Sequence, residues 1–220
     1  MLDFARARRN MVDNQLRTFD VTDRAVLAAM AEIPRERFVP ESQAAFAYLD
    51  RNVNVAEGGA EPRWMLQPMV LARMVQELEI EPGARALDVA TGHGYAAALL
   101  STLGAEVVAL ESDEALAAAA RSALAGAGRP AEVVVGPLAK GHPPRAPYDV
   151  ILVNGAVEER PDALLAQLKE GGRLACLVRE GAAGHAMLYV RAGSGFGLRR
   201  LFDASAPVLR EFRAEPSFQF

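Results

Sequence analysis

The sequence predicts an α/β fold in which a mostly parallel, doubly wound β-sheet follows a helical cap and precedes a β-hairpin. Three observations lead to this prediction. From residue 83 onward, short apolar runs alternate with stretches of helical periodicity. Residues 1–80 combine helical and proline-rich patterns without that alternation. Residues 181–220 hold two strand-like runs around a glycine-rich turn, which is typical of a hairpin.

The composition is that of an ordinary globular chain, with 51% hydrophobic and 24% charged residues among 220. This length suffices for one domain with a sizeable core. We expect a single domain over residues 1–220. It comprises a helical cap and substrate-side segment (1–80), a ligand-binding core (81–180), and a hairpin with a tail (181–220).

The net charge of −4 comes from 24 basic and 28 acidic residues, so the chain lacks the basic field of a nucleic-acid-binding protein. No stretch approaches the roughly 18 uninterrupted apolar residues that a membrane span needs. The N-terminus lacks the long apolar core of a secretory signal. We therefore expect no nucleic-acid partner, no membrane association and a cytoplasmic location.

The cap is predicted to begin with helical structure over residues 1–34. Apolar side chains recur at helical spacing over residues 21–33, and Pro34 ends the run. Thr22 or Asp23 is the expected N-cap, because its side-chain oxygen can accept from a free N–H of the first turn.

The second half of the cap is predicted to be irregular with short helices. Residues 34–68 contain four prolines and the Gly58-Gly59 pair, which interrupt regular structure. Pro68 is then expected to open a helix that runs to residue 78, since the first helical position needs no N–H.

The core is predicted to alternate five strands with three helices. The expected strands are 85–90, 106–111, 131–135, 149–154 and 173–178, and the expected helices are 95–103, 114–125 and 161–168. Such alternation indicates a parallel sheet with right-handed crossovers and helices on both faces. Two further strands, 185–191 and 198–203, are expected to add a hairpin at one sheet edge.

Cysteine and histidine are too sparse to suggest a metal site. The single cysteine, Cys176, lies within an apolar strand and is interpreted as a core thiol. His142 and His185 have no partners at metal-ligand spacing, so no metal is expected.

The candidate ligand site is the segment DVATGHGY, residues 88–95, where a strand gives way to a helix. Glycines there let the backbone approach a ligand, and the helix N-terminus offers free N–H groups. Glu111 ends the next strand, 19 residues after Gly92. A carboxylate at that position can accept both hydroxyls of a nucleoside ribose, although a solvated strand-end acid is the alternative.

Two nucleoside cofactors fit this pattern. Gly92, Gly94 and Ala97 satisfy the dinucleotide fingerprint that binds NAD. Asp88 four positions before the glycines, and about 80 residues of cap ahead of the strand, favour a methyltransferase that uses S-adenosyl-L-methionine (AdoMet).

Several motifs outside the glycine loop make the chain resemble the protein-L-isoaspartate O-methyltransferase family over most of its length. They begin with MVDNQLR (residues 11–17) and TDRAVLAAM (22–30). IPRERFVP (33–40) and AYLD (47–50) are the most diagnostic, and Gln67-Pro68 follows. PYDVI (147–151) and LKEGGRL (168–174) are similar to the later motifs of the family.

The resemblance implies a Rossmann-like, AdoMet-dependent methyltransferase that methylates a carboxylate of damaged isoaspartyl residues. Its partner would then be a protein or peptide with an exposed carboxylate. The chemistry is undemanding, because a carboxylate is already ionised near neutral pH and in-line positioning supplies most of the effect. The resemblance assigns cofactor binding to Asp88, Ala90, Thr91, Gly92, Gly94, Glu111, Gly136 and Leu138.

The sequence departs from the family pattern at three places. Leu66 stands where the family has an active-site serine and Trp64 where it has a threonine, so a hydroxyl contact worth about 1.5–3 kcal/mol is lost. Ala90 replaces the first loop glycine, which is tolerable if its φ is negative. Pro137 replaces an adenine-binding acid, and the backbone of Leu138 is expected to substitute in part.

No residue is assigned as catalytic with certainty. Gln67, Arg63 or Thr91 are the candidates to replace the lost hydroxyl, and Asn52 and Asn54 flank the expected substrate mouth. His93 is expected to contact substrate or the methionine end of AdoMet, or to be a semi-exposed loop residue. Asn154 is expected to contact substrate or cofactor, or to cap a helix or turn.

Three functions remain open on the sequence. The first is isoaspartyl methylation by positioning alone. The second is methylation of a different acceptor, since Trp64, Met65 and Leu66 make the mouth more apolar. The third is a non-catalytic AdoMet-binding or interaction protein that retains the fold.

Overall fold

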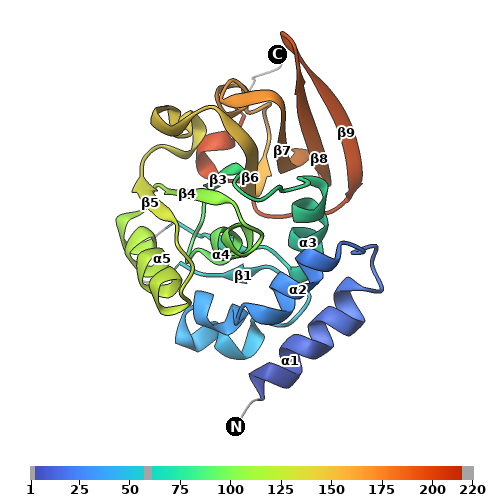
Figure 1. Ribbon diagram of the computed structural model, residues 1–220, viewed down its shortest axis with the longest axis vertical. Helices are drawn as coiled ribbons and strands as arrows, with labels where there is room; N and C mark the ends of the chain where they lie inside the picture. Colours follow the sequence, from blue (N-terminus) through green and yellow to red (C-terminus); the bar gives the residue numbers. More distant parts are fainter. Residues whose placement is uncertain (1–2, 57–60, 215–220) are drawn as a thin grey trace.

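A seven-stranded sheet forms the centre of the molecule in the computed structural model, which describes residues 3–56 and 61–214 (Figure 1). The strand order is β5-β4-β3-β6-β7-β8-β9. The five parallel strands are β3 (Arg85–Val89), β4 (Glu106–Glu111), β5 (Glu132–Val135), β6 (Tyr148–Val157) and β7 (Leu168–Glu180). The predicted parallel sheet is thus confirmed.

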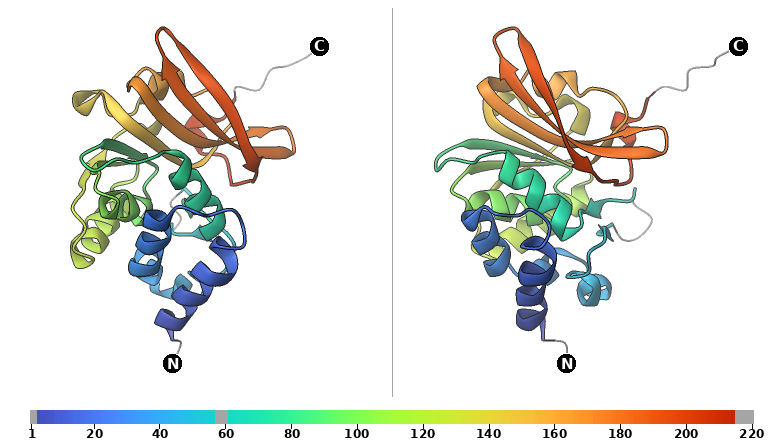
Figure 2. Two further views of the ribbon diagram at one scale, coloured as in Figure 1. Left: turned by 45° about the vertical axis from the view of Figure 1, so that its right-hand side comes forward. Right: turned by 90° about the vertical axis from the view of Figure 1, so that its right-hand side faces the viewer.

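The predicted edge hairpin is also confirmed. Strands β8 (Ala183–Ala192) and β9 (Gly195–Asp203) pair antiparallel with each other, and β8 pairs antiparallel with β7. The hairpin lies at the far end of the molecule from the N-terminal helices (Figure 2).

Alternating side chains of the central strands divide the core into two clusters, one on each face of the sheet. In β3, Ala86 packs into one cluster and Leu87 into the other, and Val107 and Val108 of β4 divide in the same way. Both faces of these strands are buried, which explains why they appear in the sequence as continuous apolar runs.

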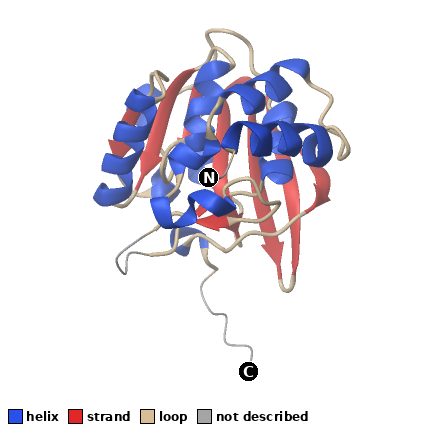
Figure 3. Cartoon of the chain, turned by 90° about the horizontal axis from the view of Figure 1, so that it is seen from below, coloured by secondary structure: helices blue, strands red, loops and turns tan. Residues whose placement is uncertain are grey.

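Helices cover both faces of the sheet. One cluster includes side chains of α1 (Phe4–Met11), α2 (Arg24–Glu32), α3 (Pro68–Glu77), α4 (Tyr95–Thr102) and α5 (Glu114–Gly126). Seen from below, these helices lie across the near face of the sheet (Figure 3). The other cluster is completed by α6 (Asp162–Leu165) and by Leu209 and Phe212 near the C-terminus.

The predicted N-cap of α2, its end before Pro34 and the start of α3 at Pro68 are confirmed, whereas the helical structure expected over residues 1–34 is interrupted between residues 17 and 23. Asp23 caps α2 by accepting from the backbone N–H groups of Ala25 and Val26 at 2.7 and 3.0 Å. Pro68 occupies the first position of α3. A π-helical turn, Val12–Leu16, follows α1, and two 3₁₀ turns, Arg35–Phe38 and Glu41–Phe46, lie between α2 and α3.

Two details of the secondary structure were predicted incorrectly. The helix expected over residues 161–168 is only the four-residue α6, because Leu168 already pairs with Tyr148 in the sheet. The second is a small antiparallel pair, β1 (Val53–Asn54) with β2 (Trp64–Met65), where only irregular structure and short helices were expected. Strands of two residues are too short to show a periodic pattern.

A membrane-crossing helix, long and apolar enough to span a bilayer, is absent from residues 3–56 and 61–214.

Candidate functional site

The loop between β3 and α4 has left-handed backbone conformations at three alternate positions, at the carboxyl edge of the sheet. Ala90, Gly92 and Gly94 have φ values of 59°, 58° and 88°. The two glycines adopt this conformation at little cost. Their turns carry the chain from the end of β3 to the N-terminus of α4, which is where ligands of open α/β sheets bind.

From the sequence, alanine is expected to be tolerated at position 90 only if its φ is negative, and the structure does not meet this condition. Its φ is positive, so its methyl group occupies a position that favours glycine. The residue is 1% exposed and packs with Leu87 and Val89 in the core. The loop therefore keeps its left-handed turn without the glycine.

Gly92 lies close to two side chains of the cap. A Cβ atom built on it would stand 3.0 Å from Cγ2 of Val55 and 3.4 Å from Cγ of Arg63. Its N–H donates to Oε2 of Glu111 at 2.9 Å. The loop and the end of β4, predicted to share one site, are thus in direct contact.

Asp88 lies fully buried beneath the loop. Its carboxylate accepts from the hydroxyl of Thr91 at 2.5 Å and from Nδ2 of Asn154 at 2.6 Å. Burial raises the pKa of Asp88 to about 7, and these two hydrogen bonds oppose the shift. Thr91 and Asn154, expected to face cofactor or substrate, here hold Asp88 in place.

Glu111 ends β4 in a fully buried position. Besides Gly92, the backbone N–H of Ser112 donates to Oε1 at 2.8 Å. Arg63 supplies the other partner, since its Nε lies 3.1 and 3.0 Å from the two carboxylate oxygens and its Nη2 lies 2.8 Å from Oε1. Arg63, predicted to contact substrate, therefore forms a buried ion pair with the predicted ribose ligand.

Gly136 and Leu138 follow β5 at the same edge. The N–H of Gly136 donates to the carbonyl of Glu111 at 2.9 Å, which brings the ends of β4 and β5 together. Pro137 leads into a 3₁₀ turn, Leu138–Lys140, and the side chain of Leu138 is buried.

A small cavity lies between the glycine loop and the segment before α3. Its apolar walls are Phe38, Val55, Met65, Leu66, Leu71, Tyr95 and Ala96, and its other lining residues are Trp64, Thr91, Gly92, His93 and Asn154. Leu66, at the family's serine position, is 1% exposed. The indole N–H of Trp64 is buried and has no acceptor among the described residues.

Arg35 contacts two residues that line this cavity, Leu66 and Tyr95. The guanidinium is fully buried, donates to the carbonyls of Ala47 (2.6 Å) and Leu66, and lies 4.8 Å from the centroid of the Tyr95 ring. Burial lowers the pKa of the guanidinium. The motif around residue 35 thus reaches the segment that carries Leu66.

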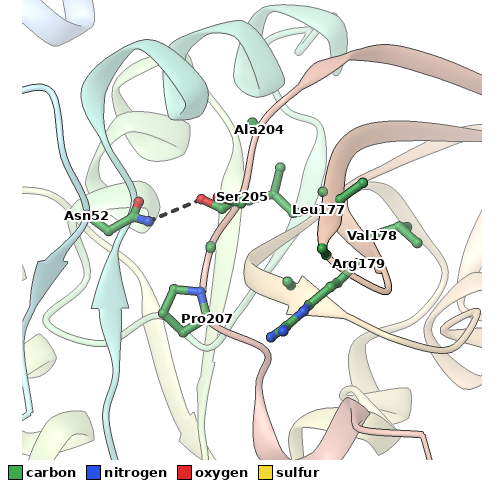
Figure 4. A pocket seen from close by; sticks show the side chains of 12 residues that line it. Asn52, Leu177, Val178, Arg179, Ala204, Ser205 and Pro207 are labelled. Atoms are coloured by element: carbon green, nitrogen blue, oxygen red, sulfur yellow. Dashed lines mark hydrogen bonds between the residues drawn. The ribbon is translucent and has the colours of Figure 1, made fainter.

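A larger hollow of about 370 Å³ opens beside the ends of β6 and β7 (Figure 4). Asn52 lies at its rim and donates to the carbonyl of Ser205 at 3.3 Å. The Asn52 amide oxygen accepts from the backbone N–H of Gln67 at 3.0 Å. Gln67 itself is the N-cap residue of α3. Arg179 lines the same hollow.

Sequence reasoning missed three residues of this region. The sequence places Arg35 only within a family motif and Trp64 only among the apolar residues of the substrate mouth. It places Asn52 beside that mouth without indicating its hydrogen bonds. The indole donor of Trp64 was available from its residue type alone. The contacts of Arg35 and Asn52 span 12 to 153 residues and leave no local signal.

Cys176 is buried, as predicted, and burial raises the pKa of its thiol to about 12. Within the part of the chain that the structure describes, no group of three or more acidic, histidine or cysteine side chains could hold a metal ion.

Comparison with known proteins identifies one family. The family model described as protein-L-isoaspartate (D-aspartate) O-methyltransferase matches residues 6–198. A relative of that name from Methanoculleus marisnigri is 45% identical over 77% of this chain and 76% of its own. Another from Roseiflexus is 38% identical over 92% of this chain and 91% of its own.

Solved structures of the same name share the fold. One has a TM-score of 0.80 at 26% identity, with 92% of this chain covered, and this chain spans 65% of that longer chain. A Plasmodium falciparum structure in complex with S-adenosyl-L-homocysteine has a TM-score of 0.79 at 20% identity, and the match covers 93% and 98% of the two chains.

Proposed function

This chain belongs to the protein-L-isoaspartate (D-aspartate) O-methyltransferase family, and we propose that it transfers the methyl group of AdoMet to the carboxylate of an isoaspartyl residue in a protein or peptide. The observation that carries the proposal is family membership across the cap and the core together. The family model matches residues 6–198, a range that includes most of the cap, the glycine loop and Glu111, and relatives are up to 45% identical.

The chemistry of the donor set fits AdoMet. The carboxylate of Glu111 is suited to the two hydroxyls of a ribose, and it lies beside Gly92, whose missing Cβ leaves room for close approach. We assign Gly92, Gly94 and Glu111 to the nucleoside and methionine parts of the cofactor. Asp88 supports the loop from below through Thr91.

AdoMet supplies a methyl group on a positively charged sulfur, and the acceptor carboxylate supplies the attacking oxygen. This carboxylate is ionised near neutral pH, so the protein needs no general base. The part left to the protein is to align the two reactants and exclude water, and effective molarities show that alignment alone can be worth about 7–11 kcal/mol.

The indole N–H of Trp64, which lines the small cavity, is available to the acceptor carboxylate in place of the missing serine hydroxyl. Thr91 already donates to Asp88, whereas the N–H of Trp64 is buried without an acceptor in the described residues. We assign Trp64 as the contact to the substrate carboxylate, which differs from the three candidates that the sequence offers, Gln67, Arg63 and Thr91.

Transfer of labelled methyl from AdoMet to a synthetic isoaspartyl peptide tests the proposal. We expect a methyl ester that hydrolyses in mild base. Absence of ester from protein that binds S-adenosyl-L-homocysteine would rule out this substrate while preserving the cofactor.

A second candidate is methylation of a more apolar carboxylate, and the apolar lining of the small cavity favours it. Substitution Leu66→Ser separates the two. A gain in isoaspartyl activity without loss of any other activity supports the isoaspartyl site, whereas loss of activity toward an apolar acceptor supports the second candidate.

A further inference from the structure

The ion pair between Arg63 and Glu111 lies in the interior of the protein. Both side chains are buried, at 4% and 0% exposure, and the guanidinium contacts both carboxylate oxygens. Ion pairs on protein surfaces contribute little, but a buried and bidentate pair restricts both partners strongly. This pair joins β4 to the segment just before β2.

The acceptor capacity of Glu111 is used up in this arrangement. A carboxylate has about four lone-pair positions. Two contacts come from the N–H groups of Gly92 and Ser112, and the remaining ones come from Nε and Nη2 of Arg63. Two ribose hydroxyls and the guanidinium cannot all be accommodated on the same two oxygens.

We propose that Arg63 occupies the ribose position of the cofactor site and is displaced from Glu111 when AdoMet binds. This inference rests on the proposed function in one respect, the assignment of Glu111 to the ribose. Arg63 then contacts Glu111 in the free protein instead of cofactor or substrate. It sets the affinity for the cofactor, because the cofactor must displace it.

The displaced guanidinium has acidic partners nearby. A hollow of about 400 Å³ adjoins Arg63 and is lined also by Glu61, Ser112, Asp113, Arg210 and Glu211. Arg63 can therefore turn from the buried carboxylate toward this hollow. There Glu61 pairs with Arg210 at 3.0 Å and Asp113 caps α5, while Glu211 accepts from the N–H of Ala139 at 3.4 Å and has acceptor positions left for a guanidinium. The exchange keeps the guanidinium partnered, so displacement does not leave a buried charge alone.

Removal of the Arg63 side chain changes the affinity for the cofactor in opposite directions, depending on whether Arg63 competes with the ribose or orients Glu111 for it. If Arg63 competes with ribose, its removal destabilises only the free protein and cofactor binds more tightly. If Arg63 merely orients Glu111 for the ribose, its removal weakens binding.

Calorimetric titration with S-adenosyl-L-homocysteine measures that direction. We expect Arg63→Ala and Arg63→Gln to bind it more tightly than the wild type, by between about 5- and 150-fold, the usual range for such coupling. Arg121→Ala is the matched control, because Arg121 pairs with Glu114 at 2.8 Å on the surface, and its affinity should equal that of the wild type.

Thermal unfolding gives the second readout. Without ligand the Arg63 variants should melt below the wild type, because Glu111 loses its cation, and saturating S-adenosyl-L-homocysteine should raise their Tm more than that of the wild type. If Arg63→Ala does not fold, the affinity of Arg63→Gln is used instead, because glutamine retains a hydrogen-bond donor that can stabilise Glu111 in the free protein.

Equal or weaker binding by folded Arg63 variants would overturn the displacement of Arg63 while leaving the proposed function intact. Failure of the wild type and of every folded variant to bind would overturn both. Tight binding without methylation of an isoaspartyl peptide would remove only the proposed substrate.

Discussion

Ala90 holds a backbone conformation that suits glycine, and its methyl group is packed into the core. The positive φ costs an L-residue about 1–2 kcal/mol, while the buried methyl returns about 0.8 kcal/mol. The two effects are of similar size, which explains how the loop tolerates alanine at this position.

The strain at Ala90 can be measured against Ala86, which lies in the preceding strand β3. Ala90→Gly and Ala86→Gly both remove a buried methyl group and both loosen the unfolded chain, but only the first relieves a positive φ. We expect Ala90→Gly to be less destabilising than Ala86→Gly by about 1–2 kcal/mol in urea unfolding. Equal losses of stability would show that the left-handed turn at residue 90 costs nothing.

Asp88 should make stability depend on pH. Because the pKa of Asp88 is raised to about 7 in the folded protein, the folded state keeps a proton that the unfolded state has lost between about pH 4 and 7. Relative to Asp88→Asn, the free energy of unfolding of the wild type should fall across that window by up to about 1.4 kcal/mol per pH unit and be level above it. Parallel profiles from urea titrations of the two proteins would contradict the raised pKa.

Trp64 carries a buried N–H without an acceptor in the described residues of the free protein. If this donor contacts the substrate carboxylate, Trp64→Phe should lower kcat/KM on an isoaspartyl peptide about 10- to 100-fold, as expected for a charge-assisted hydrogen bond of about 1.5–3 kcal/mol. Affinity for S-adenosyl-L-homocysteine serves as the control and should not change. An unaltered kcat/KM would remove Trp64 from the site.

Individual site residues could be predicted where their position follows from strand and loop order. The contact between Gly92 and Glu111 follows from adjacent parallel strands that end at one edge. The pairing of Arg63 with Glu111 could not be predicted, because it joins residues 48 apart through an irregular segment. The positive φ at Ala90 could not be predicted from the sequence either, since alanine itself favours negative φ.

At the scale of elements, Arg35 connects three parts of the cap that have little regular structure. It extends from its own 3₁₀ turn to the carbonyls of Ala47 and Leu66, and its guanidinium lies over the ring of Tyr95 at the start of α4. Segments without helix or strand hydrogen bonds need side-chain donors of this kind. The position of Leu66 in the small cavity therefore depends on Arg35.

This connection predicts a large difference between two arginines of the same turn. Arg35→Lys should cost about 2–5 kcal/mol in unfolding free energy, since lysine cannot reproduce the planar fork and leaves a buried carbonyl unpaired. Arg37→Lys, at an exposed position of that turn, should change stability by less than about 0.5 kcal/mol. Similar effects of the two substitutions, measured by chemical denaturation, would deny Arg35 this role.

The regular elements of the core were predictable to within a few residues, while the cap was predictable only in character. Strands β3 and β4 have both faces buried and therefore show uninterrupted apolar runs. The four-residue α6 was overestimated because its apolar pattern continues into β7, where Leu168 joins the sheet. Short pairings such as β1 with β2 depend on contacts distant in sequence.

At the scale of the whole molecule, the parallel sheet brings the site together at one edge. The loop after β3, Glu111 at the end of β4, Gly136 after β5 and Asn154 within β6 all lie on that side, joined by the hydrogen bonds described above. The cap closes over this edge through Arg63 and through the segment that holds Trp64 and Leu66. The cofactor site therefore comes from the core, and the acceptor side comes from the cap.

The proposed function requires this site to methylate isoaspartyl rather than ordinary aspartyl residues. The most direct measurement is kcat/KM for methyl transfer from AdoMet to two peptides that differ only in an isoaspartyl or aspartyl linkage. We predict a preference for the isoaspartyl peptide of at least about 100-fold, within the range that a shaped site achieves. Equal rates on the two peptides, or no transfer to either by protein that binds S-adenosyl-L-homocysteine, would contradict it.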